Sequence, residues 1–149
     1  MKSYLFVAIG GFLGAICRFA LKNIQFFNYK GEFPVNTLTV NVTGAFALAF
    51  FLALSLDVIK LGDEVRQGVA IGFLGAYTTF STLCKEFITL LDSFRYAELF
   101  LYTVLSIALG LLAVYAGMTS AQVLLAMTLK KKNDIKMQMR EESKKKDGV

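Results

Sequence analysis

Residues 72–82 read GFLGAYTTFST and place five hydroxyl side chains and two phenylalanines inside a run that carries no charge. In a bilayer, an unpaired hydroxyl or backbone group has no water to bond and is strongly destabilising, so such a cluster normally faces other protein or a solvated path. The stretch therefore indicates a helix that crosses a membrane among other helices. We interpret it as the centre of an ion pathway.

The composition around this stretch is that of a small membrane protein. Of the 149 residues, 56% are hydrophobic, and the mean hydropathy is +0.57. The runs without Asp, Glu, Lys or Arg cover residues 3–17, 33–56, 67–84 and 99–129. A bilayer core of about 30 Å needs roughly 20 apolar residues, so the shorter first and third runs must extend past their charged ends. We expect an all-α membrane protein with four transmembrane helices, at residues 4–21, 33–56, 65–91 and 97–129.

Residue types that carry enzyme chemistry are missing from these helices. The chain has no histidine and no acidic cluster in the predicted spans, so the usual metal ligands and acid–base catalysts are lacking. Cys17 and Cys84 lie at the ends of apolar runs without the spacing of a metal or redox pair, and we expect them to serve packing. We do not expect an enzyme.

The last twenty residues differ from the rest of the chain. Residues 130–149 hold eight of the sixteen Lys and Arg residues, so we separate a transmembrane channel domain at 1–129 from a basic, disordered tail at 130–149. We expect the tail to lie near anionic lipid headgroups rather than to bind nucleic acid. Before the tail is counted, three basic residues fall on the side of the N-terminus and five opposite; with it the ratio is eleven to five. The near-balance of the core fits insertion in both orientations, although short chains also reach balance by chance.

Small residues recur every fourth position in two of the predicted helices. Gly10 and Gly14 form such a face in the first helix, and Gly68 and Gly72 form one in the third. These faces allow close packing within a subunit or between subunits. Arg18 follows near the end of the first helix, where its side chain either snorkels to the interface, binds helix-end carbonyls or draws an anion toward a pore.

Polar groups lie on three predicted helices at depths where lipid cannot pair them. In the second helix Thr37 and Asn41 share a face, and the Asn41 amide either bonds another helix or offers two donors to an anion. In the third, the glycines and threonines of residues 75–79 favour an unwound turn whose free carbonyls hold a cation, with a plain kinked helix as the competing interpretation. In the fourth, Tyr102 and Ser106 lie one turn apart.

The predicted spans carry hydroxyl and amide groups but no titratable carboxylate at their centre. A proton-coupled exporter needs a group that changes charge inside the membrane, whereas a passive channel needs only donors, acceptors and a narrow path. Hydroxyl and amide donors suit a small anion, and the electropositive edge of a phenylalanine ring attracts anions without trapping them. Four short helices leave little room for both a packed core and a lined pore, so we expect a dimer.

Three stretches together resemble the Fluc (CrcB) family of small bacterial fluoride channels. They are GGFLGAICRF at residues 10–19, FPVNTLTVNVTGAF at 33–46 and GFLGAYTTFST at 72–82. The resemblance covers nearly the whole chain before the tail. It implies a dual-topology, antiparallel dimer with a broken third helix and two pores that export fluoride passively across the bacterial plasma membrane. It also implies a structural sodium ion at the dimer interface.

The resemblance further implies roles for single residues. Backbone carbonyls of Gly75 and Thr78 would hold the sodium ion, and Arg18 and Glu86 match charged family positions near helix ends. The residues that we place on the ion pathway are Asn41, Phe80, Tyr102 and Ser106, with Thr37, Thr79 and Ser81 as polar neighbours.

Two positions depart from the family pattern. Asn36 stands where the family usually has glycine, and Leu83 stands where it generally places a second phenylalanine, three residues after Phe80. Either one aromatic ring suffices in a homodimer of this chain, or the chain is one subunit of a heteromeric fluoride channel. Two different functions would also suit four short helices. One is a small proton-coupled multidrug or cation exporter, whose required acid in the first helix is missing, and the second is a membrane subunit with no transport of its own.

Overall fold

The computed structural model describes residues 2–23, 33–57 and 61–147, and in these ranges all regular structure is helical, as predicted. The elements are α1 (Lys2–Asn23), α2 (Val35–Asp57), α3 (Asp63–Gln67), the π-helix η2 (Gly68–Leu74), α4 (Gly75–Tyr77), α5 (Phe80–Asp92) and α6 (Tyr96–Asp147). The first two helices agree with the predicted ranges to within two residues at each end, which is the usual spread of helix boundaries.

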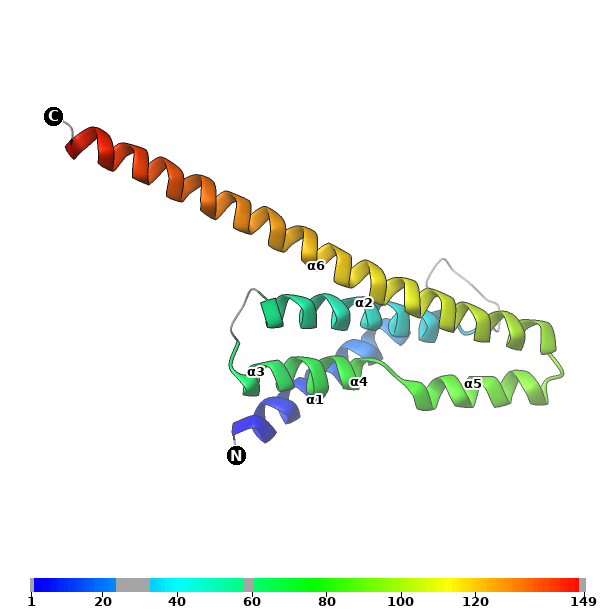
Figure 1. The fold of residues 1–149 in the computed structure, drawn as a ribbon. Coiled ribbons are helices and arrows are strands. Elements are labelled where there is room, and N and C mark those ends of the chain that lie inside the picture. Colours follow the sequence, from blue (N-terminus) through cyan, green and yellow to red (C-terminus); the bar gives the residue numbers. More distant parts are fainter. Residues whose placement is uncertain (1, 24–32, 58–60, 148–149) are drawn as a thin grey trace.

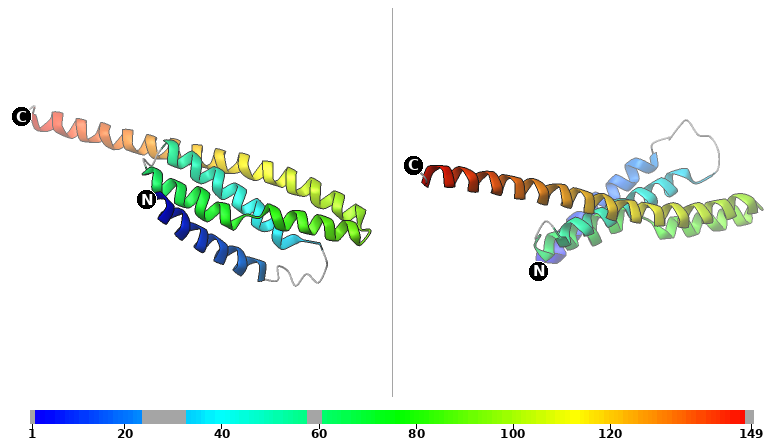
Figure 2. Two further views of the ribbon diagram at one scale, coloured as in Figure 1. Left: turned by 90° about the horizontal axis from the view of Figure 1, so that it is seen from below. Right: turned by 45° about the horizontal axis from the view of Figure 1, so that its top comes forward.

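Glycines allow α1 to approach η2 closely. α1 packs mainly on η2 and α2 mainly on α6, so that α1 lies on one side of residues 63–92 and α2 and α6 lie on the other (Figures 1 and 2). A Cβ atom at Gly10 would collide with the carbonyl of Gly68, and one at Gly14 would collide with the carbonyl of Phe73. The predicted small faces of the first and third helices therefore meet inside the subunit.

The helical path of residues 63–92 is interrupted at Thr78 and Thr79. Both residues have extended backbone, with φ and ψ of −77° and 161° at Thr78 and −149° and 111° at Thr79. Just before them, η2 has the wider i→i+5 winding, which is rare and often lies at functional sites. The Thr79 side chain then accepts a hydrogen bond from the Thr82 N–H and so caps the start of α5.

Three helices are long and apolar enough to cross a membrane, judged by length and composition within the described ranges. They are Lys2–Asn23, Val35–Ser55 and Tyr96–Gln138. α5, with 13 residues, is too short to do so alone, because a crossing needs roughly 20. Large apolar side chains point outward along the bundle, for example Phe12 at 67% exposure and Phe100 at 72%. Such a surface suits contact with lipid.

The C-terminal tail continues the last helix. The sequence predicts disorder from residue 130, but α6 runs unbroken to Asp147 and projects beyond the end of the bundle at which α1 begins and α2 ends (Figure 1). Residues 130–147 contain no Gly or Pro. Good helix formers stabilise a helix even where no other element packs on it.

Candidate functional site

Glu86 joins three helices through its carboxylate. The Thr37 hydroxyl on α2 donates to Glu86 Oε1 at 2.6 Å, and the Tyr102 hydroxyl on α6 donates to Oε2 at 2.8 Å. Thr37 is 1% exposed and Tyr102 is 0% exposed, so both hydroxyl groups depend on this partner. From the sequence we expected Glu86 near a helix end, and Thr37 and Tyr102 on the ion pathway. In the structure the hydroxyls of Thr37 and Tyr102 both donate to Glu86, so these protons are not free for an anion.

Two aromatic rings hold the Tyr102 ring in place. Phe33 meets it edge-on at a centroid distance of 5.6 Å, and Phe87 does so at 5.3 Å. Edge-to-face pairs of this kind are favourable beyond their buried area. The Tyr102 side chain is therefore fixed at its ring as well as at its hydroxyl.

Ser106, one turn beyond Tyr102, has an unpaired hydroxyl. Its Oγ atom is buried and has no hydrogen-bond partner among the described residues. By contrast, the nearby Thr103 hydroxyl bonds the carbonyl of Leu99 at 2.8 Å, as hydroxyls in apolar helices commonly do. A buried hydroxyl without a partner is unfavourable unless a ligand or water completes it. Of the predicted pathway residues, Ser106 thus has a donor that the subunit itself does not use.

Asn41 pairs with both backbone groups of Thr79. The Thr79 N–H donates to Asn41 Oδ1 at 2.8 Å, and Asn41 Nδ2 donates to the Thr79 carbonyl at 3.1 Å. The Thr79 hydroxyl donates to Thr82 Oγ1 at 3.0 Å and lies 3.3 Å from the Ser81 hydroxyl. The structure therefore brings Asn41, Thr79 and Ser81 together at the interruption of the helix.

Phe80 and Ser81 point away from the subunit. Phe80, the first residue of α5, is 77% exposed, and Ser81 is also exposed. Phe80 thus does not meet Tyr102 or Ser106 inside one copy of the chain in the way that a common pathway would require. A second surface must cover it if it is to line a narrow path.

The Arg18 side chain contacts the interruption of the helical path at Thr78. Its Nη1 atom donates to the Thr78 carbonyl at 3.3 Å, which favours the carbonyl-binding role over simple snorkelling. Carbonyl oxygens are also the ligands that small hard cations prefer. No group of three or more Cys, Asp or Glu side chains that could hold a metal occurs in the described ranges.

Comparison with known proteins assigns the chain to a family. A sequence model described as "CrcB-like protein, Camphor Resistance (CrcB)" matches residues 5–118. The chain belongs to the CrcB family. The resemblance seen in the three sequence stretches is thereby confirmed, and with its apolar helices this CrcB protein is a multi-pass membrane protein.

Relatives of this CrcB protein carry channel names. This chain is 41% identical over 129 residues to "Fluoride-specific ion channel FluC 2" of Carboxydothermus hydrogenoformans. The aligned residues make up 87% of this chain and 94% of the relative. The chain is 40% identical over 114 residues to "Fluoride-specific ion channel FluC 1" of Staphylococcus aureus (strain NCTC 8325 / PS 47), covering 76% and 92%. The identity to "Fluoride-specific ion channel FluC 1" of Moorella thermoacetica is 37% over 120 residues, covering 80% and 86%.

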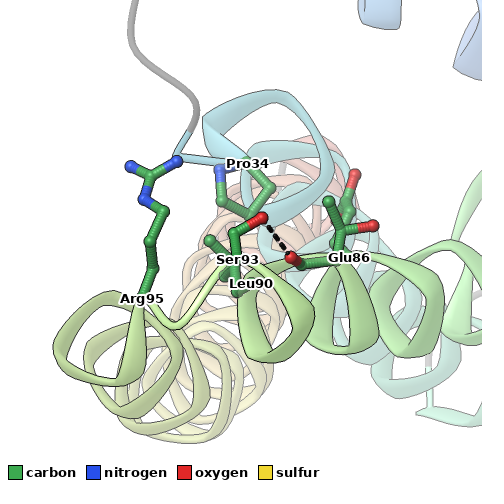
Figure 3. Close-up of a pocket in the computed structure, with 6 residues that line it drawn as sticks. Pro34, Glu86, Leu90, Ser93 and Arg95 are labelled. Carbon is green, nitrogen blue, oxygen red and sulfur yellow. Dashed lines mark hydrogen bonds between the residues drawn. The ribbon is translucent and has the colours of Figure 1, made fainter.

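A pocket of about 280 Å³, with polar and apolar lining residues, opens beside Glu86 in this CrcB protein. Figure 3 shows Glu86 at one side of it and Arg95 at the other, with Pro34, Leu90 and Ser93 between them. Arg95 Nε donates to Glu98 at 2.9 Å, and the Ser93 hydroxyl donates to the Thr89 carbonyl. The pocket therefore places Glu86, one of its lining residues, beside both polar and apolar side chains.

The sequence did not single out two of the contacts at the interruption. The hydroxyls of Thr43 and Tyr77 lie 2.8 Å apart, and Thr82 receives the Thr79 hydroxyl. Thr82 and Tyr77 belong to the hydroxyl-rich stretch at 72–82, so the composition of the stretch contained a signal for them. Nothing in the sequence around Thr43 marks it as a partner of Tyr77. In the structure its hydroxyl also bonds the carbonyl of Thr39, as the hydroxyl of an ordinary helical threonine does.

Proposed function

We infer that this chain forms a passive, fluoride-selective ion channel of the cell membrane. Membership of the CrcB family and the names of its relatives support the ion and the activity. The structural observation that carries the proposal is the buried, unpaired Ser106 hydroxyl on the longest apolar helix. A small anion that accepts a strong hydrogen bond would complete it, and the absence of a charged ligand at that point lets the ion leave again.

In this proposal α3, η2, α4 and α5 together make the third of four membrane crossings, broken at Thr78 and Thr79. Two copies assemble in antiparallel orientation, and the dimer contains two pores. The exposure of Phe80 and Ser81 supports this assembly, because the polar break beside them cannot be paired by lipid and needs protein or water. A facing subunit would bring the edge of Phe80 against the pathway of its partner.

The pathway residues then have different tasks. Ser106, the second N–H of the Asn41 amide and the ring edge of Phe80 would contact fluoride, and Ser81 and Thr79 would add hydroxyls beside the break. Thr37 and Tyr102 would form the wall, since their protons are held by Glu86. A structural sodium ion at the dimer centre would rest on the carbonyls of Gly75 and Thr78.

Fluoride efflux from liposomes tests the function. Purified full-length protein is reconstituted with an imposed fluoride gradient, and external fluoride is followed with an ion-selective electrode. We expect release of fluoride and retention of chloride in a parallel experiment, because a narrow donor-lined path disfavours the larger ion. Fluoride release no faster than from protein-free vesicles would exclude a channel made of this chain alone.

The heteromeric form of the channel is suggested by Leu83, which lacks the ring edge that the family places there. The same assay is repeated after co-expression with a related subunit that carries phenylalanine at that position. Efflux that requires the second subunit favours the heteromer, whereas equal efflux without it favours two copies of this chain. A proton-coupled exporter is not favoured by the family or by the names of the relatives.

A further inference from the structure

The second helix contacts the interruption of residues 63–92 at two neighbouring positions. Asn41 bonds both backbone groups of Thr79, at 2.8 and 3.1 Å. One turn later, a Cβ atom at Gly44 would collide with the Thr78 side chain, so α2 and the break are in direct contact there. Specific contacts with α2 therefore stabilise the interrupted conformation, in addition to the low helix propensity of the local sequence.

Two side chains divert the amides that would otherwise close the helix. In a continuous α-helix each N–H donates to the carbonyl four residues earlier. The Thr79 N–H would therefore bond the Gly75 carbonyl, but it donates to Asn41 Oδ1. The Thr82 N–H would bond the Thr78 carbonyl, but it donates to Thr79 Oγ1 at 3.2 Å. The carbonyls released from helical bonding in this way include those of Gly75 and Thr78.

The Thr78 carbonyl has room for a second partner. Arg18 Nη1 donates to it at 3.3 Å, and a carbonyl oxygen has two lone pairs. The Asn41 amide likewise has a second N–H, since the Thr79 carbonyl takes only one of the two. The Asn41 side chain therefore bonds the break through its oxygen and one N–H, and its second N–H takes no part in these two bonds.

We propose that Asn41 is a positioning residue for a cation site, because it accepts the Thr79 N–H and thereby frees the Gly75 carbonyl. The Thr79 hydroxyl acts similarly, since it accepts the Thr82 N–H and thereby frees the Thr78 carbonyl. This inference rests on the proposed function, which supplies the sodium ion. Its new content is that a residue expected to contact the anion also determines the geometry of the cation site. The anion pathway and the cation site are then coupled through one amide side chain.

The test is a sodium titration of purified full-length protein in detergent, with N-methyl-D-glucamine keeping the ionic strength constant. The readouts are the sodium concentration that gives half of the thermal stabilisation and the exchange rate of the Thr79 amide proton. The test variant is Asn41→Leu. The matched control is Asn36→Leu, which removes a comparable bond from the same helix, that of Asn36 Nδ2 to the Lys22 carbonyl at 2.9 Å.

We expect Asn41→Leu to raise the half-effective sodium concentration by about 10–100-fold, the usual effect of removing a group that orients metal ligands, and to speed exchange at Thr79. Asn36→Leu should at most lower the thermal unfolding midpoint measured without sodium. It should leave the dependence of that midpoint on sodium concentration unchanged. If Asn41→Leu does not fold, Thr79→Val, which removes the acceptor of the Thr82 N–H, should weaken the sodium response in the same direction.

An Asn41→Leu protein that responds to sodium as the unchanged protein does, even if it no longer conducts fluoride, would overturn the proposal and leave Asn41 as a pathway residue only. If the unchanged protein conducts fluoride but its stability is independent of sodium, the proposal fails while the channel function stands. If it neither conducts fluoride nor responds to sodium, both fail.

Discussion

Glu86 is a carboxylate beside a proposed anion pathway, and its two bonds explain how that arrangement is tolerated. The hydroxyls of Thr37 and Tyr102 donate to its two oxygens, and Glu86 also lines the pocket that contains Arg95. The negative charge is therefore surrounded by donors that come from α2 and α6. In the proposed pathway, the donors left for an anion are those of Ser106 and Asn41.

Glu86→Leu should destabilise the protein by about 2–4 kcal/mol, because it leaves two buried hydroxyls without an acceptor. Glu86→Gln should lose about 1 kcal/mol or less, since its amide can pair with both hydroxyls once one of them reverses. The measurement is denaturation of the purified proteins in detergent. Equal stability of the two variants would show that the carboxylate does not hold Thr37 and Tyr102 together.

Phe80→Leu should suppress fluoride efflux while the protein remains folded and assembled. Phe80 is 77% exposed in one subunit, so its loss removes little packing within the chain, but it removes the ring edge that we propose contacts the anion. Phe100→Leu is the control, because Phe100 is a similarly exposed ring on the outer surface of α6. The readouts are liposome efflux and size-exclusion elution; undiminished efflux in Phe80→Leu would remove this ring from the pathway.

At the residue scale the sequence singled out polar groups that the structure brings into contact, but it did not predict how they pair. The hydroxyl-rich stretch and the shared face of Thr37 and Asn41 were visible as spacing. Whether Thr37 would meet Glu86, and Asn41 would meet Thr79, depends on the rotation and depth of α2 relative to α5, and spacing within one helix carries no information on that. For the same reason, the sequence placed Glu86 near a helix end but did not indicate its partners.

At the scale of elements, the contact of α1 with η2 depends on how closely two backbones approach. The small-residue spacing predicted such a contact for Gly10, Gly14, Gly68 and Gly72, and each of these glycines meets the backbone or Cβ of the opposite segment. The π-helical winding of η2 was not predictable. It has i→i+5 bonding over residues that also pack against α1, and the spacing of small residues gives no signal for that winding.

Gly14→Ala should destabilise the protein by about 1–3 kcal/mol, because the added methyl group would overlap the Phe73 carbonyl and neither backbone can move away freely. Gly11→Ala is the matched control on the same helix, since its nearest neighbour, the Gly72 carbonyl, lies 4.0 Å from the added atom. It should be neutral or slightly stabilising. Detergent denaturation of both variants measures the difference, and a tolerated Gly14→Ala would argue against the close approach of α1 and η2.

At the scale of the whole molecule, α6 separates a membrane part from a basic extension without any change of element. The start of α1, the end of α2 and the extension of α6 lie at the same end of the bundle, and the α5–α6 turn lies at the other (Figure 1). The many Lys and Arg residues at 130–149 led us to expect a disordered tail, whereas α6 continues to Asp147 in the structure. Helix propensity alone continues α6 there.

The extension should decide how the chain inserts. With residues 130–149 the basic residues stand eleven to five in favour of the end that carries both termini, and without them three to five. Because Lys and Arg near a span favour the cytoplasmic side, the full chain should insert mainly with its C-terminus inside, and deletion of 130–149 should bring the two orientations close to equal. A cysteine placed at the exposed Gly62, with Cys17 and Cys84 replaced by serine, reports orientation through labelling of intact cells with an impermeant maleimide.

Neutralising the tail's acidic residues, Asp134, Glu141, Glu142 and Asp147, is the matched control, because acidic residues contribute little to orientation and this variant should label like the full chain. Equal labelling of the full and truncated chains would assign orientation to the loops instead. The result also bears on Leu83. If two copies of this chain form the antiparallel channel, the truncated protein should give more efflux per chain, since both orientations are then abundant. If a second subunit must supply the missing ring, evening out the orientations should leave efflux unchanged.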